Sequence, residues 1–409
     1  MDELRTRGRV EVGGLSVLFF LHGAALGMWF VPLSTVLDAH GLRAIKPWAF
    51  AASALAAFVS PLFFGAMADR EASPVKVLRG LALATSGAMA LASTAISLGW
   101  PAWLVLAVIQ LHALCSSPTF SLSSTIAFAR LADARKEFGP IRAMATLGWA
   151  AGCWLVSAMR ADTSPLAGYS GAVMWLVVAA FTFVLPAEQR LEPAGKLSWR
   201  ERLGLDALTL LKNPDHRVVF LTAALFSIPL AAFYPYAPPH LRELGFQRTA
   251  AWMTLGQVTE IITMFSLGAL LLKWRLKWIF AWGLTFGVLR FGLSALNSKA
   301  WLLSGIVLHG GSYTLVFITA QIYLEQRVEA AWRARAQALM TLMTGGVGNL
   351  LGYLGTGWWF SRCSRAGGTQ WPDFWAGLAV AAGLVMANFL AAYRGKRRTQ
   401  GVGEKSGPL

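Results

Sequence analysis

Charged residues are scarce in this chain: Asp, Glu, Lys and Arg make up 14% of 409 residues, against 56% hydrophobic residues. A soluble globular protein carries about 25% charged residues, so this composition excludes a soluble enzyme. Cysteine is also rare, with 3 residues, which excludes a secreted disulfide scaffold. The abundance of apolar residues excludes a disordered chain, because disordered chains are poor in them.

Signatures of catalytic sites are missing as well. The sequence has no Cys and His spacing typical of a metal site, no phosphate-binding glycine loop and no nucleophile elbow. We therefore expect no enzyme activity, no metal and no bound cofactor.

The sequence contains many long stretches without any charged residue. A membrane-spanning helix needs about 20 mostly apolar residues, and most of these stretches reach that length. The chain is therefore predicted to be an all-α polytopic membrane protein. The charge-free stretches are 12–37, 47–68, 80–129, 143–159, 163–187, 218–241, 300–324, 336–361 and 374–393.

Turn signals and short basic clusters divide these stretches into individual helices. The longest stretch breaks at Gly99-Trp100-Pro101, a turn signal, and a basic cluster at 273–277 separates two further helices. Twelve transmembrane helices are predicted, at 13–37, 47–68, 77–98, 101–128, 140–160, 166–186, 217–241, 249–271, 276–297, 300–324, 334–361 and 373–393.

The distribution of basic residues predicts the orientation of the chain in the membrane. The formal net charge is +16, which in a soluble protein would suggest nucleic acid as a partner. With the N-terminus inside, however, the cytoplasmic segments hold 26 Lys and Arg residues and the outer loops hold 8. This asymmetry follows the positive-inside rule, so both termini are expected in the cytoplasm, and no nucleic-acid partner is needed.

One sizeable loop lies at the midpoint of the chain. It predicts an N-terminal six-helix bundle at 1–186, a central cytoplasmic loop at 187–216, a C-terminal six-helix bundle at 217–393 and a basic cytoplasmic tail at 394–409. Two related six-helix halves are the plan of a major facilitator transporter, whose solute site lies near the membrane midplane between them. The loop between the second and third helices reads GAMADR, from Gly65 through Asp69 to Arg70. This resembles the conformational G-x-x-x-D-R motif of that superfamily, in its usual place.

Seven passages resemble a more specific family, the bacterial nucleoside:proton symporters of the inner membrane, and they occur in family order. They are GMWFVPLSTVL (27–37), SPTFSLSSTIAF (117–128), GPIRAMATLGW (139–149), LGLDALTLLKN (203–213), GQVTEI (256–261), LRFGLSAL (289–296) and ARAQALMTLMTGGVG (334–348). The resemblance implies a monomeric secondary active transporter in the bacterial inner membrane, with the lipid bilayer around it. It would take up nucleosides with protons, by alternating access.

Polar residues inside the predicted helices identify a candidate site without help from the family. A charged side chain at the bilayer centre costs about 2.5–3.5 kcal/mol on insertion scales, so one kept there faces a cavity or a partner. Three sets of polar and aromatic residues share a helix face by their spacing: Arg142, Thr146 and Trp149; Gln257 and Glu260; His309 and Tyr313.

The family resemblance falls on these same positions. In the symporters, the residues matching Arg142, Thr146, Trp149, Gln257 and Glu260 contact the nucleoside. The family has two aromatic residues at the positions of His309 and Tyr313, followed by an acid where Thr314 stands here. Two amide residues of its seventh helix fall near Ala231 and Tyr234, so Tyr234 joins the candidate site.

A buried carboxyl group can also carry the coupling proton. Glu260 has eleven uncharged residues before it and twelve after it, and it is our candidate for proton coupling. His309 is the other titratable candidate.

Other interpretations of these residues remain open from the sequence. Arg142 can be an interfacial anchor, Trp149 and Tyr313 can be packing residues, and His309 can be a core histidine. Arg290 can be a partner of Glu260 or an independent structural charge. The missing family residues also leave room for another solute, such as a sugar or a drug-like compound. A transport-inactive membrane sensor or partner subunit on the same fold is a third alternative.

Overall fold

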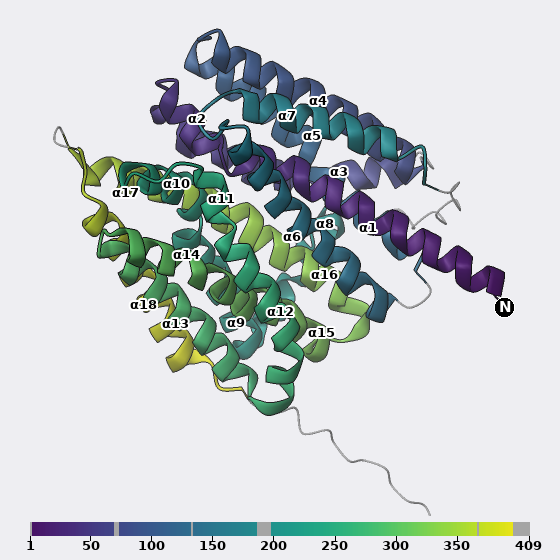
Figure 1. Cartoon of the computed structure of the whole chain (residues 1–409). Helices are drawn as coiled ribbons and strands as arrows, with labels where there is room; N and C mark the ends of the chain where they lie inside the picture. The colour runs from purple at the N-terminus through teal and green to yellow at the C-terminus, as the bar shows by residue number, and fades with distance from the viewer. Residues whose placement is uncertain (1, 69–72, 132–133, 186–197, 366–367, 396–409) are drawn as a thin grey trace, which may run out of the picture.

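The computed structural model describes residues 2–68, 73–131, 134–185, 198–365 and 368–395 (Figure 1). Within these residues the fold is all helical apart from one antiparallel strand pair, β1 (Ser364–Arg365) with β2 (Gly368–Thr369). Helices satisfy every backbone hydrogen bond internally, which is what a chain crossing a lipid bilayer requires. The structure therefore agrees with the all-α prediction.

The helices of the first part of the chain lie together on one side of the molecule, drawn purple to blue in Figure 1. They are α1 (Asp2–Phe30), α2 (Leu33–Ala39), η1 (Arg43–Ile45), α3 (Lys46–Ala68), α4 (Pro74–Ser97), α5 (Ala102–Phe128), α6 (Ala134–Ala158) and α7 (Leu166–Phe181).

The remaining helices, drawn teal to yellow in Figure 1, lie on the other side, and α6 runs along the boundary. They are α8 (Trp199–Arg202), η2 (Leu205–Lys212), α9 (Pro214–Leu230), α10 (Phe233–Glu243), α11 (Thr249–Met253), α12 (Leu255–Lys273), α13 (Leu276–Ala295), α14 (Lys299–Tyr313), η3 (Thr314–Ile318), α15 (Thr319–Arg327), α16 (Ala330–Thr341), η4 (Leu342–Gly348), α17 (Asn349–Cys363) and α18 (Trp371–Ala392).

Local sequence signals explain where several helices begin and end. The predicted break at Gly99 is confirmed, because α4 ends at Ser97, α5 begins at Ala102 and Gly99 has φ +66°. Proline at the first helical position suits a helix start. Accordingly α4 begins at Pro74 with the Ser73 hydroxyl capping it, and α9 begins at Pro214 with Asn213 as the cap.

Five expected continuous helices are interrupted in the structure, and the one expected at 249–271 divides at Thr254 into α11 and α12. The expected helix at 13–37 breaks before Leu33, and the one at 217–241 breaks before Phe233. A proline stands near each break, and proline disrupts the hydrogen-bond ladder of a helix. The helix expected at 300–324 contains the π-helical turn η3, and a second π turn, η4, lies between α16 and α17. Such turns occur frequently at functional sites.

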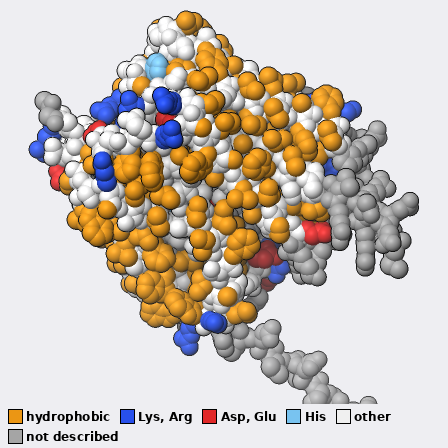
Figure 2. Space-filling view, in the orientation of Figure 1, with side chains coloured by type: hydrophobic (Ala, Val, Ile, Leu, Met, Phe, Trp, Pro, Cys, Tyr) orange, Lys and Arg blue, Asp and Glu red, His pale blue; other side chains and the backbone are white. Residues whose placement is uncertain are grey.

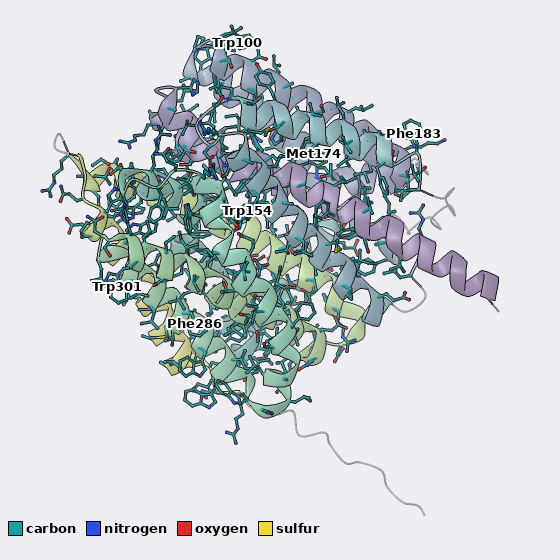
Figure 3. All side chains as sticks on the ribbon, viewed as in Figure 1. Trp100, Trp154, Met174, Phe183, Phe286 and Trp301 are labelled. Atoms are coloured by element: carbon teal, nitrogen blue, oxygen red, sulfur yellow. The ribbon has the colours of Figure 1, made fainter. Side chains whose placement is uncertain are left out.

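Eight helical stretches among the described residues are long and apolar enough to cross a membrane. They are Val12–Ala39, Pro74–Ser97, Ala102–Phe128, Pro214–Glu243, Thr249–Lys273, Leu276–Ala295, Lys299–Arg327 and Trp371–Ala392. Hydrophobic side chains cover much of the visible face in Figure 2, while Lys and Arg gather in a few patches. Large apolar side chains such as Trp301 and Phe183 point outward (Figure 3). An apolar exterior of this kind fits a lipid-facing surface and makes the protein integral to the membrane.

Two close helix contacts position the candidate site. A Cβ atom on Gly148 of α6 would lie 1.9 Å from the backbone oxygen of Phe20, so α6 packs directly on α1. A Cβ atom on Gly310 of α14 would lie 2.0 Å from the backbone nitrogen of Glu260, so α14 packs directly on α12. Glycine at these points lets the backbones approach, as is common between membrane helices. As a result, the closely packed pair α1 and α6 lies on one side of the middle of the molecule, and the pair α12 and α14 lies on the other.

Candidate functional site

A cavity of about 480 Å³ lies between the two groups of helices. All eight residues that the sequence predicts as a solute site line it: Arg142, Thr146, Trp149, Tyr234, Gln257, Glu260, His309 and Tyr313. They come from α6, α10, α12 and α14, so helices that are far apart in the sequence line the same cavity. The shared helix faces predicted from residue spacing therefore converge on a single space.

The α6 side of the cavity offers a cation, a hydroxyl and an indole. The guanidinium of Arg142 lies 4.3 Å from the centre of the Phe120 ring. The Trp149 ring lies 5.8 Å from the ring of Tyr234, which comes from the other group of helices. The indole nitrogen of Trp149 is buried and has no hydrogen-bond partner among the residues that the structure describes. An unpaired buried donor in a cavity wall is costly, which suggests that a ligand group pairs with it.

On the α12 side, the side-chain amide of Gln257 has a hydrogen-bond partner among the described residues for its nitrogen only. Nε2 of Gln257 donates to the hydroxyl of Tyr234 at 3.2 Å, while Oε1 of Gln257 is buried without a partner in the described part of the chain. Tyr234 therefore contacts another candidate residue directly, as well as lining the cavity. Gln257 Oε1 and the Trp149 indole nitrogen are thus one unpaired acceptor and one unpaired donor, both buried, in residues that line the cavity.

Glu260 lies one turn beyond Gln257 on the same face. Within the described residues its carboxylate forms no ion pair and no hydrogen bond, and it is not among the atoms sealed from solvent. Its charge interacts with that of Arg142 across the cavity. The site therefore carries one cation and one carboxylate that are not paired directly, and polar groups of a solute can bridge them.

His309 lies in the α14 wall and is held by aromatic and cationic neighbours. Its ring stacks on Phe233 with centroids 4.0 Å apart and an interplanar angle of 20°. Nδ1 of His309 lies 2.5 Å from Nη1 of Arg290, a residue of α13 outside the cavity lining. Arg290 is thus the partner of His309, and no ion pair joins it to Glu260 among the residues that the structure describes.

Thr314 stands where the resembling family carries an acid. Its side chain is fully buried at the start of the π turn η3 and does not line the cavity, and within the described residues its hydroxyl has no partner. The neighbouring Tyr313 does line it, with its ring 6.1 Å from that of His309. No carboxylate replaces the family's acid at this point, which leaves Glu260 as the acidic residue in the cavity lining.

Several cavity residues were missed by the sequence interpretation. All of those named here are uncharged: Ser227, Phe317, Gln321, Thr341, Thr344, Asn349 and Tyr353. Polar residues within the charge-free stretch 336–361 were an available signal for four of them. The two π turns also lie along this wall, since η3 contains Phe317 and η4 contains Thr344.

The predicted conformational motif cannot be compared with the structure. Asp69 and Arg70 lie outside the described residues, and Gly65 lies in α3 where the side-chain environment is not described.

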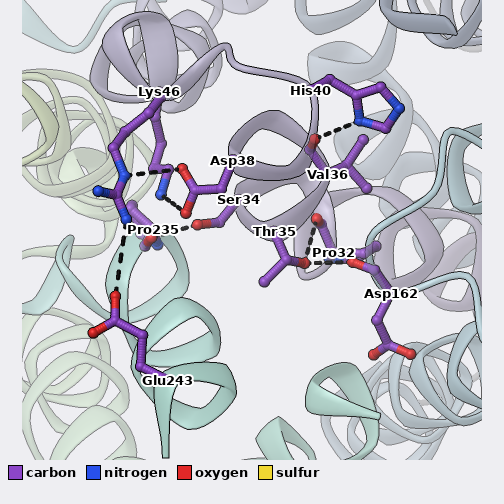
Figure 4. A network of polar contacts seen from close by, with 11 residues as sticks. Pro32, Ser34, Thr35, Val36, Asp38, His40, Lys46, Asp162, Pro235 and Glu243 are labelled. Atoms are coloured by element: carbon purple, nitrogen blue, oxygen red, sulfur yellow. Dashed lines mark hydrogen bonds and ion pairs between the residues drawn. The ribbon is translucent and has the colours of Figure 1, made fainter. Parts of the chain in front are cut away.

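One end of the cavity is closed by hydrogen bonds around α2 (Figure 4). The hydroxyl of Ser34 donates to the backbone oxygen of Pro235, and that of Thr35 donates to the backbone oxygen of Asp162. Arg43 lies 3.9 Å from the carboxylate of Glu243, and Lys46 pairs with Asp38 at 2.6 Å. We refer to this side as the α2 end.

Asp162 extends the closure of the α2 end to the start of α11. Its Oδ1 atom accepts hydrogen bonds from the backbone nitrogen of Ala250 at 2.7 Å and from the Ser157 hydroxyl at 2.9 Å. The Ser157 hydroxyl also accepts a bond from the backbone nitrogen of Ala251 at 3.0 Å. Nearby, Trp154 donates from its indole to Thr254 at 3.1 Å, at the boundary between the helix groups seen in Figure 3. Acceptors at a helix N-terminus satisfy its free N–H groups, so these contacts favour the closed arrangement.

At the opposite end, the segment α8–η2 is tied to α16. Arg335 lies 2.8 Å from Asp206 and 3.5 Å from Glu201. A backbone hydrogen bond from Ser198 to Glu201 lowers the pKa of this carboxyl group below its usual value, so it stays ionised beside Arg335. The cavity lining runs toward this α8 end through Gln321 of α15 and Thr341 of α16.

Comparisons with known proteins agree with this architecture. The family model described as "Nucleoside H+ symporter" matches residues 12–398. The putative nucleoside transporter YegT of Escherichia coli (strain K12) is 35% identical over 358 residues, covering 83% of this chain and 82% of the relative. The nucleoside permease NupG of the same organism is 25% identical over 407 residues, covering 93% and 96%. A crystal structure of the nucleoside transporter NupG superposes with a TM-score of 0.83 at 23% identity, covering 94% of this chain and 99% of that one.

Proposed function

The chain belongs to the nucleoside H+ symporter family, and we propose that it takes up nucleosides together with protons, as a secondary transporter working by alternating access. It is a transporter and not an enzyme. The observation that carries the proposal is the cavity between two groups of helices, whose lining combines Arg142, Glu260 and the aromatic ring of Trp149.

The chemistry of the cavity wall fits a neutral solute with a hydroxylated ring and a flat base. Arg142 can donate to sugar hydroxyls and Glu260 can accept from them. An aromatic face stacks on a base with about 1–3 kcal/mol, and the Trp149 ring supplies such a face. The volume of about 480 Å³ lies within the range of roughly 300–1,000 Å³ of small-molecule sites.

The orientation of the protein follows from its basic residues. We place the α8 end and both termini in the cytoplasm and the α2 end on the periplasmic side of the inner membrane, because Lys and Arg concentrate in the segments that this assigns to the cytoplasm. The stretches that contain α3, α6, α7 and α16–α17 complete a set of twelve spans in this proposal. Two separate hydrophobic clusters, one drawn mostly from residues up to 185 and one mostly from residues after 206, support two bundles that move as units.

The arrangement of contacts corresponds to an inward-facing state under this orientation. Hydrogen bonds of Ser34, Asp162 and Trp154 close the α2 end, while the cavity lining continues toward the α8 end. Breaking these contacts and forming others at the α8 end would expose the same cavity to the periplasm. Rocking of two bundles around a fixed site is the general scheme of such carriers.

Glu260 is the group that we assign to proton coupling. A carboxyl group exposed in turn to each side of the membrane can take up a proton outside and release it inside. Neutralising Glu260 would also change its interaction with Arg142 across the cavity, which links proton uptake to solute binding. A membrane potential contributes about 2.3 kcal/mol per charge per 100 mV to such a cycle.

A different neutral solute is the second candidate. The family's two amides are absent, since Ala231 and Tyr234 stand near their positions. This loss supports a sugar or a drug-like compound as the alternative solute. Uptake of labelled uridine, inosine and a hexose should be measured with the purified protein in proteoliposomes, at two proton gradients. We expect uptake of nucleosides that rises with an inward proton gradient; uptake of the hexose alone would overturn the assignment.

A further inference from the structure

Arg290 carries a buried charge without a carboxylate partner among the described residues. The residue is 2% exposed. Its guanidinium lies 4.3 Å from the centre of the Phe233 ring and 4.9 Å from that of Phe291. Its only hydrogen bond in the described part of the chain is the one to Nδ1 of His309, at 2.5 Å. A buried cation needs every available partner, so this bond matters to both residues.

The direction of this hydrogen bond follows from the chemistry of the two groups. A guanidinium has donors only, so Nδ1 of His309 must offer its lone pair. A neutral imidazole has a single N–H, which therefore sits on Nε2. An imidazolium would turn an N–H toward Arg290 and place two cations in contact. Repulsion between these charges strongly disfavours the protonated form of His309.

Nε2 of His309 opens onto the solute cavity. His309 belongs to the lining, yet this nitrogen makes no hydrogen bond within the described residues and is not among the atoms sealed from solvent. The stack on Phe233, at 4.0 Å, fixes the plane of the ring. On the neighbouring helix, a Cβ atom on Gly256 would lie 3.2 Å from Cδ2 of His309, so α12 leaves little room for rotation.

We propose that Arg290 is a positioning residue that determines specificity: it holds His309 neutral with its proton on Nε2, so that His309 donates a hydrogen bond to an acceptor on the solute. The acceptor would be a carbonyl oxygen of the nucleobase. This inference rests on the proposed function for the identity of the solute, but the state of His309 does not depend on it.

The surroundings of His309 leave Glu260 as the proton carrier. The titratable and charged groups that share the cavity or contact His309 are Arg290 on α13, Glu260 on α12, Tyr234 on α10, Tyr313 on α14, Tyr353 on α17 and Arg142 on α6. Arg290 keeps the second proton off His309, and the other groups apart from Glu260 are phenols or a guanidinium. In this proposal His309 forms a hydrogen bond with the nucleobase, and Glu260 takes up and releases the coupling proton.

Nitrogen NMR of the whole protein tests the state of His309 directly. Protein labelled with ¹⁵N-histidine is measured in lipid from pH 5 to pH 8, and the H309Q variant identifies the signals of His309. We expect one neutral tautomer, protonated on Nε2, throughout this range. A proton on Nδ1, or an imidazolium near neutral pH, would overturn the proposal whether or not the protein binds nucleosides.

Binding of uridine, 2-thiouridine and 4-thiouridine tests the role in specificity, because sulfur accepts hydrogen bonds more weakly than oxygen. We expect the parent to bind one of the two thio analogues about fivefold more weakly than uridine, as one neutral hydrogen bond predicts. H309F should remove this discrimination, R290M should weaken it, and R290K should restore part of it.

Controls separate the outcomes of this experiment. H40Q changes a histidine whose Nδ1 bonds the backbone oxygen of Val36, away from the cavity, and should leave the discrimination unchanged. H309F carries the test by itself if R290M does not fold. Equal binding of all three compounds by the parent and by H309F would refute the role of His309. A parent that binds none of them would instead refute the proposed function, while the NMR result would still decide on Arg290.

Discussion

The carboxylate of Asp162, which follows α6, accepts a hydrogen bond at 2.7 Å from the backbone nitrogen of Ala250 at the start of α11. This contact joins the two groups of helices at the α2 end, where Ser157 supports it by donating to the same oxygen at 2.9 Å. In an alternating-access cycle such a bond exists only while this end is closed. Asp162 therefore contributes to the balance between the two states and not to solute recognition.

Replacing Asp162 by alanine should shift the protein toward its outward-facing state. A hydrogen bond to a charged group contributes about 1.5–3 kcal/mol, which corresponds to a change of roughly ten- to a hundredfold in the equilibrium. Thr344 lines the cavity toward the α8 end, so a cysteine there should be labelled from the cytoplasmic side in the parent and more slowly in the Asp162→Ala background.

Ser266→Ala is the control for this experiment. The Ser266 hydroxyl bonds only the backbone oxygen of Ile262 in its own helix, so its loss should not change labelling at position 344. The native cysteines are replaced beforehand. Equal labelling rates with and without Asp162 would show that the α2 end is held closed by other contacts.

Removing the indole N–H of Trp149 should weaken solute binding while the stacking ring is kept. In Trp149→Phe the unpaired donor is lost, and we expect affinity for uridine to fall about fivefold, in line with one neutral hydrogen bond. Arg142→Ala should have a larger effect, because hydrogen bonds from a charged donor are roughly twice as strong. Isothermal titration of the purified variants provides the measurement.

The matched control for Trp149 is Trp301→Phe, since Trp301 points outward from the molecule (Figure 3). It should bind uridine like the parent. If Trp149→Phe and Arg142→Ala also did so, Arg142 would be better explained as an interfacial anchor and Trp149 as a packing residue.

Adding a methyl group at Gly310 should displace both α14 and α12, which each contribute residues to the site. A Cβ atom there would lie 2.0 Å from the backbone nitrogen of Glu260, so α14 and α12 must move apart. We expect Gly310→Ala to lower the melting temperature by several degrees, as overpacking of about 1–3 kcal/mol would, and to reduce uridine binding. Gly268→Ala adds the same methyl group on α12 where nothing lies within 4 Å, and it should leave both quantities nearly unchanged. Similar melting temperatures for the two variants would contradict the close contact.

Reporter fusions test the orientation. Green fluorescent protein fused after Leu409 should fluoresce, and alkaline phosphatase fused at the same position should be inactive, because the distribution of basic residues predicts a cytoplasmic C-terminus. An active phosphatase fusion would reverse the sides assigned to the α2 and α8 ends.

Residue spacing predicted which side chains line the cavity better than it predicted the course of the helices. Residues one or two turns apart, such as Arg142 and Thr146, share a face wherever the helix is regular, so their spacing was sufficient to place them on one wall. The interruptions around Leu33 and Phe233, and the π turn after Tyr313, depend on how helices pack and were not visible in a charge-free stretch.

Contacts between distant segments were beyond the sequence pattern. Nothing around Arg290 indicates that its partner is His309 on the next helix, and the loop position of Asp162 gives no sign that it caps α11. These pairs depend on the relative placement of helices, which a single sequence does not encode as a local periodicity.

Substituting Glu260 should separate binding from proton coupling. Glu260→Gln keeps the size and hydrogen bonding of the side chain but cannot ionise, so the variant should bind and exchange uridine yet not concentrate it. Gln321→Glu, which adds a carboxylate elsewhere in the lining, tests in the Glu260→Gln background whether any acid in the cavity suffices. Accumulation by Glu260→Gln that rises normally with an inward proton gradient would remove Glu260 from the coupling role.

Proton movement driven by the solute tests the central claim most directly. Proteoliposomes that hold a pH-sensitive dye, with no proton gradient at the start, receive uridine on the outside while the internal pH is followed. The account predicts that the interior of vesicles with the parent protein acidifies as uridine enters, and that vesicles with Glu260→Gln show no such change. Uridine entry into vesicles with the parent at constant internal pH would contradict proton-coupled nucleoside transport by this protein.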